Sequence, residues 1–297
     1  MRRYDRLKDI LRLDPEKDCH TIYRWIVTYE FPWDVTRALE FALFRTYAVP
    51  GIGALLARTA ELTERSQKRY DDTSLLLDAV VEHGFDSAQG RTAVRRINQM
   101  HRAYTIPDDE MRYVLCTFVV TPTRWLDAYG WRALTNHERR AVTAYYRTLG
   151  ARMGIRDLPE SYAEFEHCMD AYEAEHYGYD AGGRAVADAT LALMATWYPR
   201  PLAPLVRRGS IALMDDRLLR AFRYPAAGAG TQRLVRGALR LRARAVRLTP
   251  PRRTPRFARH NPRIRSYPGY PDGYALDGLG TFPRTCPVPH DAPAADS

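Results

Sequence analysis

The feature that most constrains this fold is a helical spacing of apolar residues along nearly all of the 297-residue chain. Apolar side chains recur with the α-helical period of about 3.6 residues. The one β-like run is TFVVTP, residues 117–122, and helical patterns flank it on both sides. We predict helices at 4–12, 18–30, 33–47, 66–83, 88–104, 108–129, 136–153, 160–177, 182–198, 210–223 and 231–247. The sequence therefore predicts an all-α protein.

Several of these helices begin at recognisable capping signals. Thr135 and Glu138 are spaced as a capping box, in which the hydroxyl and the carboxylate each accept a hydrogen bond from a free backbone N–H. Ser161 and Glu164 repeat this spacing, and Pro107 followed by three acids suits a first helical turn. These signals predict helix starts close to residues 108, 136 and 162.

The chain length suits one large domain, and composition changes near both ends. We expect a helical N-terminal extension at 1–30, a helical domain at 31–248 and an irregular Arg/Pro-rich segment at 249–297. Proline, glycine and arginine dominate that last segment, which favours irregular structure. We expect its final ten residues to be disordered.

Positive charge is concentrated near the C-terminus. The formal net charge is +10, and residues 231–265 hold twelve arginines and no acid, so the remainder carries 10 − 12 = −2. Within this segment, an apolar seam is formed by Leu234, Ala238, Leu241, Ala245 and Leu248. We expect the seam to dock this helix on the body of the protein.

Two other partners suit the same basic helix. An anionic membrane surface is the first, and it makes 231–265 a peripheral membrane contact. Electrostatic binding to nucleic acid is the second. No nucleic-acid-binding motif accompanies the basic segment, so we do not expect nucleic acid as a partner.

Cysteine spacing and hydropathy indicate the compartment. The chain has no CxxC pair and no N-terminal apolar core of signal-peptide length. The most apolar stretch, residues 41–57, is interrupted by Arg45 and by Pro50-Gly51, so we expect no membrane span. The cysteines are Cys19, Cys116, Cys168 and Cys286. We predict a reducing, cytoplasmic location.

His101 stands on the apolar stripe of the 88–104 helix. Val94, Ile97 and Tyr104 lie within about 60° of it on a helical wheel. An imidazole on such a face is either a core residue with a hydrogen bond or a ligand to a metal or cofactor. A haem iron needs only one protein ligand, so a lone histidine is compatible with haem as well as with an ordinary core.

Arg69 and Thr73 share a helix face with Leu76 and Val80. An arginine on an apolar face needs an anion, because an unpaired buried charge is costly. The ordinary interpretation is an internal ion pair with a carboxylate, with Thr73 bonding back to a helix carbonyl. The alternative is that Arg69 faces the carboxylate of a ligand.

Two Glu-x-x-His pairs, Glu164/His167 and Glu173/His176, suggest a di-iron carboxylate site. The two histidines are nine residues apart, which places them on opposite sides of one helix. A di-iron site takes its pairs from two helices, so we favour a charged surface helix. No P-loop, dinucleotide-binding or nucleophile-elbow motif is present.

Arg69-x-x-x-Thr73 followed by His101 resembles the rubber oxygenase catalytic domain family, in particular its MpaB branch. The resemblance continues through MHRAYTIPDDEMRYVLCTFVVTPTRWLDAYGW, FALFRTYAVPGIGALLARTAEL and SYPGYPDGY, and covers roughly residues 30–275. It implies a single globin-related helical domain of about ten helices that binds haem b and uses O2. By resemblance, His101 would be the haem ligand, and Arg69 and Thr73 would stand near the haem.

The resemblance also implies a function: a haem-dependent oxygenase that cleaves, or inserts oxygen into, the C=C bond of a hydrophobic isoprenoid. A non-enzymatic haem carrier or sensor and a di-iron enzyme are the alternatives. Rubber oxygenases carry a lysine where this chain has Asp72, which favours the MpaB branch. Asp72, Asp78 and Glu82 are all candidates for a catalytic base, and residues 41–57 for a mobile lid.

Overall fold

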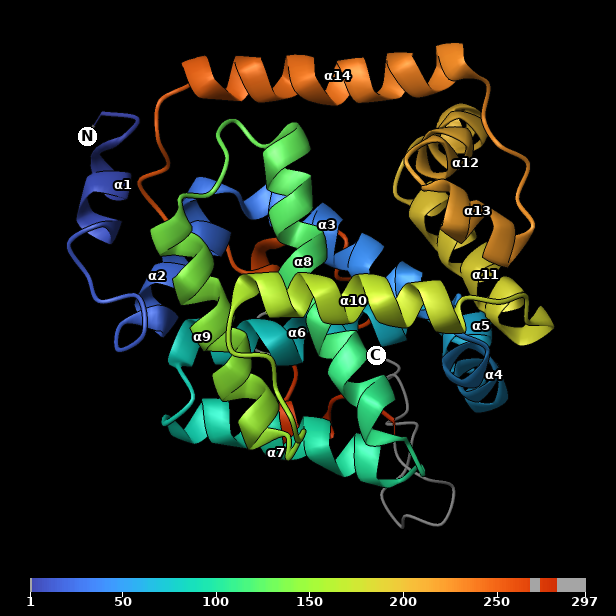
Figure 1. Cartoon of the computed structure of the whole chain (residues 1–297), viewed down its shortest axis with the longest axis horizontal. Helices are drawn as coiled ribbons and strands as arrows, with labels where there is room; N and C mark the ends of the chain where they lie inside the picture. The colour runs from blue at the N-terminus through green and yellow to red at the C-terminus, as the bar shows by residue number, and fades with distance from the viewer. Residues whose placement is uncertain (1, 268–272, 282–297) are drawn as a thin grey trace, which may run out of the picture.

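The computed structural model, which describes residues 2–267 and 273–281, is built from α-helices joined by short connections (Figure 1). In the described part, no strand is present. The principal helices are α1 (Asp5–Ile10), α2 (Cys19–Trp25), α3 (Pro32–Thr46), α4 (Pro50–Thr59), α5 (Glu61–Glu64), α6 (Ser66–His83), α7 (Ala88–Arg102), α8 (Asp108–Tyr129), α9 (Asn136–Arg152), α10 (Tyr162–His176), α11 (Ala181–Thr196), α12 (Ala203–Ala212), α13 (Asp216–Phe222) and α14 (Ala229–Leu248). The all-α prediction is confirmed.

The hydrogen bonds expected from the capping signals are present at the starts of α9 and α10. Thr135 and Glu138 form a reciprocal box at the start of α9, with 2.9 Å from Thr135 N to Glu138 Oε2 and 3.2 Å from Glu138 N to Thr135 Oγ1. Ser161 Oγ accepts from Glu164 N at the start of α10. Acids fill the first turn of α8. These contacts replace backbone partners that a helix start lacks.

α8 forms the centre of the molecule. It packs along α3, and α10 crosses its outer side (Figure 1). One apolar core gathers around α2, α3 and α6 to α10. A second, smaller core joins the end of α3 to α11 and α13.

Three helices, α4, α5 and α12, were not predicted, and two of them carry proline in the first turn. α4 starts at Pro50, and α12 has Pro204 in its first turn. Proline suits these positions because a first-turn residue needs no N–H for the helix. The predicted 210–223 helix is also divided, since Asp215 caps a new helix by accepting from Leu218 N at 3.0 Å.

Residues 41–57, proposed as a lid, are largely core. Phe44 near the end of α3, and Tyr47, Ala48 and Val49 between α3 and α4, are at most 6% exposed. In the described part, no single helix is long and apolar enough to cross a membrane; α3 and α4 meet that condition only as a pair that bends by 100°.

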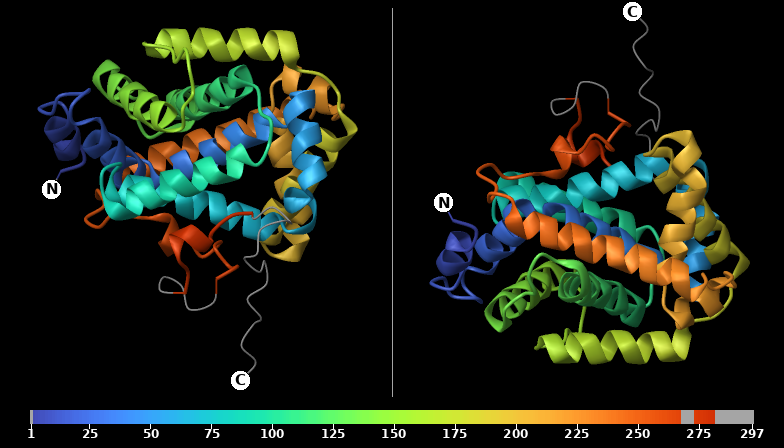
Figure 2. Two further views of the ribbon diagram at one scale, coloured as in Figure 1. Left: turned by 90° about the horizontal axis from the view of Figure 1, so that it is seen from below. Right: turned by 90° about the horizontal axis from the view of Figure 1, so that it is seen from above.

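In residues 249–267 and 273–281, which follow α14, the structure has two short 3₁₀ turns, η3 (Ala258–His260) and η4 (Leu276–Gly278), and no other helix or strand. It returns along α6 and α7 instead of projecting from the body (Figure 2). The predicted disorder of the final ten residues lies outside the described residues.

Candidate active site

α6 and α7 position the three residues singled out by the sequence. Gly84 ends α6 with a φ of +80°, and Ser87 caps α7 by accepting from Gly90 N at 2.9 Å. This short connection folds the two helices against each other. The start of α6, with Arg69 and Thr73, therefore lies beside the end of α7, with His101.

The His101 ring is held in one tautomer. Its Nδ1 lies 2.9 Å from the carbonyl oxygen of Ile97. Because a carbonyl only accepts, Nδ1 carries the proton. Burial lowers the pKa of His101, and the positive charge of Arg69 lowers it further. The ring is thus neutral near pH 7, with the lone pair on Nε2, and the described residues give Nε2 no hydrogen-bond partner.

Arg69 and Thr73 bond to each other. The Thr73 hydroxyl donates to the Arg69 carbonyl at 2.9 Å, and the Arg69 guanidinium donates to Thr73 Oγ1. The backbone bond from Thr73 was expected. The expected ion pair of Arg69 with a protein carboxylate is not seen among the described residues, and its charge instead lowers the pKa of His101. Within the described part of the chain, Arg69 is therefore a cation without a carboxylate partner beside a neutral imidazole.

The stripe around His101 is shorter than predicted. Val94 and Ile97 are buried, but α7 ends at Arg102 and Tyr104 is 37% exposed. The prediction that Tyr104 continues the stripe is wrong, because the chain leaves the helix there for Pro107 and α8. His101 therefore lies at the margin of the core.

The three acids considered as catalytic bases bind the C-terminal segment. Asp72 accepts from Lys68 Nζ at 2.8 Å and from the Tyr267 hydroxyl. Asp78 accepts from Ala258 N at 2.7 Å. Glu82 pairs with Arg259. Each carboxylate thus has a structural partner, and none is free to act as a base in this arrangement.

A second set of contacts fastens the same segment to α7. Arg96 donates to the carbonyls of Leu279 and Thr281 at 2.6 and 2.8 Å. Gly280 has a φ of +87°, and a Cβ there would lie 2.1 Å from Met100 Sδ. Residues 256–267 and 273–281 therefore form a strap across α6 and α7, which the sequence analysis did not predict.

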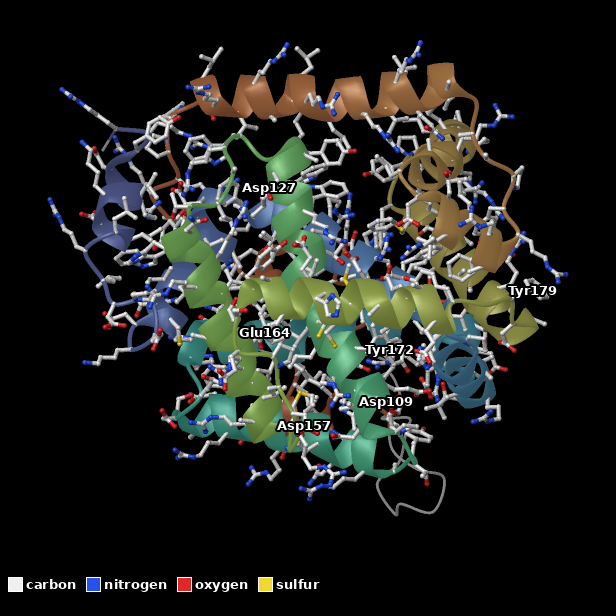
Figure 3. The ribbon with its side chains drawn as sticks, in the orientation of Figure 1. Asp109, Asp127, Asp157, Glu164, Tyr172 and Tyr179 are labelled. Atoms are coloured by element: carbon white, nitrogen blue, oxygen red, sulfur yellow. The ribbon has the colours of Figure 1, made fainter. Side chains whose placement is uncertain are left out.

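The described residues do not assemble a di-iron site. Both Glu-x-x-His pairs lie on α10, and Glu173 is buried in an ion pair with Arg45, with 2.8 Å between Oε1 and Nε. His176 stacks on Tyr172, which Figure 3 labels on α10, at 4.0 Å between ring centroids. In the part of the chain that the structure covers, no group of three or more His, Cys, Asp or Glu side chains could hold a metal ion.

Two open cavities lie on the described part of the protein. One of about 680 Å³ is polar, with Arg45, Arg124 and Glu173 among its lining residues. The other, of about 530 Å³, includes Gln67, Lys68 and Leu193 and adjoins the start of α6. Neither is lined by Arg69, Thr73 or His101.

The described residues thus form an all-helical domain in which α6 and α7 bring Arg69 and Thr73 close to His101. The chain belongs to the family described as "ER-bound oxygenase mpaB/B'/Rubber oxygenase, catalytic domain", whose model matches residues 36–248. The match contains α6, α7 and the whole of α14.

Curated relatives agree with this assignment. ER-bound oxygenase mpaB' of Penicillium brevicompactum is 30% identical over 256 residues, which cover 80% of this chain and 60% of the relative. ER-bound oxygenase mpaB of Penicillium roqueforti (strain FM164) is 31% identical over 227 residues, covering 70% and 76%. The chain thus spans 60% of the first of these relatives.

Proposed function

We propose that this chain is a haem b-dependent oxygenase that uses O2 on a hydrophobic, isoprenoid substrate. Oxidative cleavage of a C=C bond, or insertion of oxygen into it, would be the reaction. Family membership supports the oxygenase class. The observation that carries the haem proposal is the neutral His101 ring, whose Nδ1 is fixed by Ile97 and whose Nε2 lone pair has no partner among residues 2–267 and 273–281.

The residues present fit this cofactor in their chemistry. His101 Nε2 would hold the iron, and a hydrogen bond from the other ring nitrogen to a carbonyl is the usual support of a ligating histidine. Arg69 would pair with a propionate or with negative charge that develops on oxygen. Haem, when bound, would supply the activation of dioxygen.

The remaining residues would orient and shield the site. Thr73 holds the Arg69 guanidinium against α6, so the cation keeps its direction while its charge stays available. The strap would limit access of water to the α6–α7 pair. Val94 and Ile97 provide the apolar surroundings that a hydrocarbon substrate prefers. A cytoplasmic location stays a prediction.

Absorption spectroscopy tests the haem proposal. Full-length protein reconstituted with haem should show a Soret band that shifts after dithionite. His101→Ala should lose that band, whereas His83→Ala, an exposed histidine at the end of α6, should keep it. Retention of the unaltered spectrum by His101→Ala would contradict the proposal.

Product analysis then separates an oxygenase from a haem carrier. The reduced protein is supplied with O2 and isoprenoid alkenes, and carbonyl products are measured by mass spectrometry. Carbonyl formation that depends on His101 supports the oxygenase. Reversible oxygen binding without any product would establish the carrier or sensor.

A further inference from the structure

The apolar seam of α14 faces away from the protein. It was expected to dock the helix, and that prediction is wrong: Leu234 is 72%, Leu241 66% and Leu248 88% exposed. α14 instead packs on α8 and α12 through its opposite side (Figure 1). The packed side carries Val235, Leu239, Ala243 and Val246.

These leucines are exceptional among the described residues. With Leu205, at 62%, they are the four most exposed large apolar side chains. On a helical wheel, Leu234 and Leu248 lie within about 20° of Leu241, so the three form one line about 21 Å long. Figure 3 shows side chains on this outer side of α14 projecting from the body.

Arginines line one flank of this leucine line. Arg233, Arg240, Arg244 and Arg247 lie between about 60° and 120° to the same side of it. All four are exposed, and none has an ion pair or hydrogen bond among the described residues. α14 contains no acid. The outer face of α14 is therefore a line of exposed leucines bordered by arginines that have no ion-pair partner in the described part of the chain.

We propose that this face of α14 lies on a membrane surface that contains anionic phospholipids. The leucines would enter the acyl boundary while the flanking guanidiniums pair with lipid phosphates and carboxylates, as in interfacial amphipathic helices. The proposal concerns α14 alone and does not depend on the oxygenase chemistry.

Charge argues against the other occupants of the face. A second copy docked by the same face would bring two rows of unpaired arginines together, which like-charge repulsion opposes. A nucleic acid would attract the arginines but would leave the central leucines against a polar backbone. An anionic bilayer offers an apolar phase to the leucines and negative charge to the arginines.

Vesicle sedimentation with the full-length chain tests this proposal. We expect binding to vesicles of phosphatidylcholine and phosphatidylserine in about a 7:3 ratio, and little binding to phosphatidylcholine alone. Replacing Leu234, Leu241 and Leu248 by Ser should weaken binding by at least about tenfold. Arg233, Arg240, Arg244 and Arg247→Gln should weaken it similarly and remove most of its salt dependence.

Matched variants control for composition and charge. Leu11, Tyr104 and Tyr179→Ser remove three exposed apolar side chains elsewhere, and Arg12, Arg91, Arg95 and Arg156→Gln remove four exposed charges. Both controls should bind as the parent does, and thermal unfolding should confirm that all variants fold.

Three outcomes overturn the proposal. The first is equal vesicle binding by the leucine variant and the parent. The second is self-association in sedimentation velocity that only the leucine variant abolishes, which makes a second copy the occupant. The third is binding to a DNA duplex that depends on the arginines and not on the leucines.

Discussion

Arg242 of α14 and Asp34 of α3 are joined by an ion pair of 2.9 Å between Nη1 and Oδ1. The same guanidinium lies 3.7 Å from the centroid of the Trp33 ring. The Asp34 side chain is only 3% exposed, and burial raises its pKa while Arg242 opposes that rise. The Arg242–Asp34 ion pair is a polar contact within the interface between α14 and the rest of the protein, and it favours burial of this side of α14.

Loss of Arg242 should loosen α14. Arg242→Gln leaves Asp34 buried without its cation, so we expect the free energy of unfolding in urea to fall by about 1–3 kcal/mol. Asp34→Asn should recover part of this loss in the double variant, since the buried charge is removed as well. Fully additive effects of the two changes would show that the pair is not coupled.

Stability should depend on pH through Asp78. Burial raises the pKa of Asp78 to about 7, from an ordinary value of 3.8. Between these two values the unfolded chain releases a proton that the folded chain retains, so this group lowers stability as pH rises toward 7 and its effect is constant above that.

Asp78→Asn keeps an oxygen that can accept from Ala258 N. We therefore expect its free energy of unfolding, relative to the parent, to rise between about pH 4 and pH 7 and to level off above that. Urea titrations across this range measure the difference. Asp9→Asn, an exposed acid, should show no such trend; the same trend in both variants would refute the assignment to Asp78.

Cys168 should react as a thiolate at neutral pH. A hydrogen bond from Cys116 lowers the pKa of Cys168 below that of an ordinary thiol, and Arg112 contributes to the decrease. The same hydrogen bond, together with burial, raises the pKa of Cys116. The rate of alkylation by iodoacetamide at Cys168, followed by peptide mass mapping, should therefore rise with a midpoint at lower pH than that of an ordinary exposed thiol.

Cys116→Ser is the informative comparison for this reactivity. A serine hydroxyl still donates to Cys168, so the midpoint should stay low, whereas Cys116→Ala should move it upward. An unchanged midpoint in Cys116→Ala would show that the partner thiol has no influence.

Gly53 should tolerate no side chain. A Cβ there would lie 2.7 Å from both Gly183 Cα and the Tyr47 carbonyl oxygen. Because backbone atoms cannot move aside cheaply, Gly53→Ala should destabilise the protein by about 1–3 kcal/mol in thermal or urea unfolding. Gly237→Ala on α14, where nothing lies within 4 Å, should instead stabilise it by about 0.5–1 kcal/mol. Equal effects at both positions would contradict the packing argument.

Much of the secondary structure could be read locally. The boxes at Thr135 and Ser161 and the acidic turn after Pro107 mark helix starts, because each acts on backbone groups within one turn. The helices at Pro50 and Pro204 were not predicted, because a proline that follows one helix can equally stand in the first turn of the next, and only the surrounding structure selects between these possibilities.

The candidate site was predictable in part. Arg69, Thr73 and His101 stand out because a charge and an imidazole on apolar faces need partners. The strap was not predictable, because its contacts join residues far apart in the chain, such as Asp71 with Arg265 N and Ser266 N at 2.9 and 2.8 Å. The sequence around Asp71 contains no local pattern that predicts a hydrogen bond to the backbone of residues almost 200 positions away.

For α14, the sequence by itself determined a helix, its six arginines and which residues share a face. It did not determine which face is buried, because Leu234 and Leu241 mark one apolar side while Leu239 and Val246 mark the other. Only the tertiary structure decided between them. Burial goes to the side that also satisfies the buried charge of Asp34 through Arg242, since an unpaired carboxylate in the core costs more than exposed leucines do.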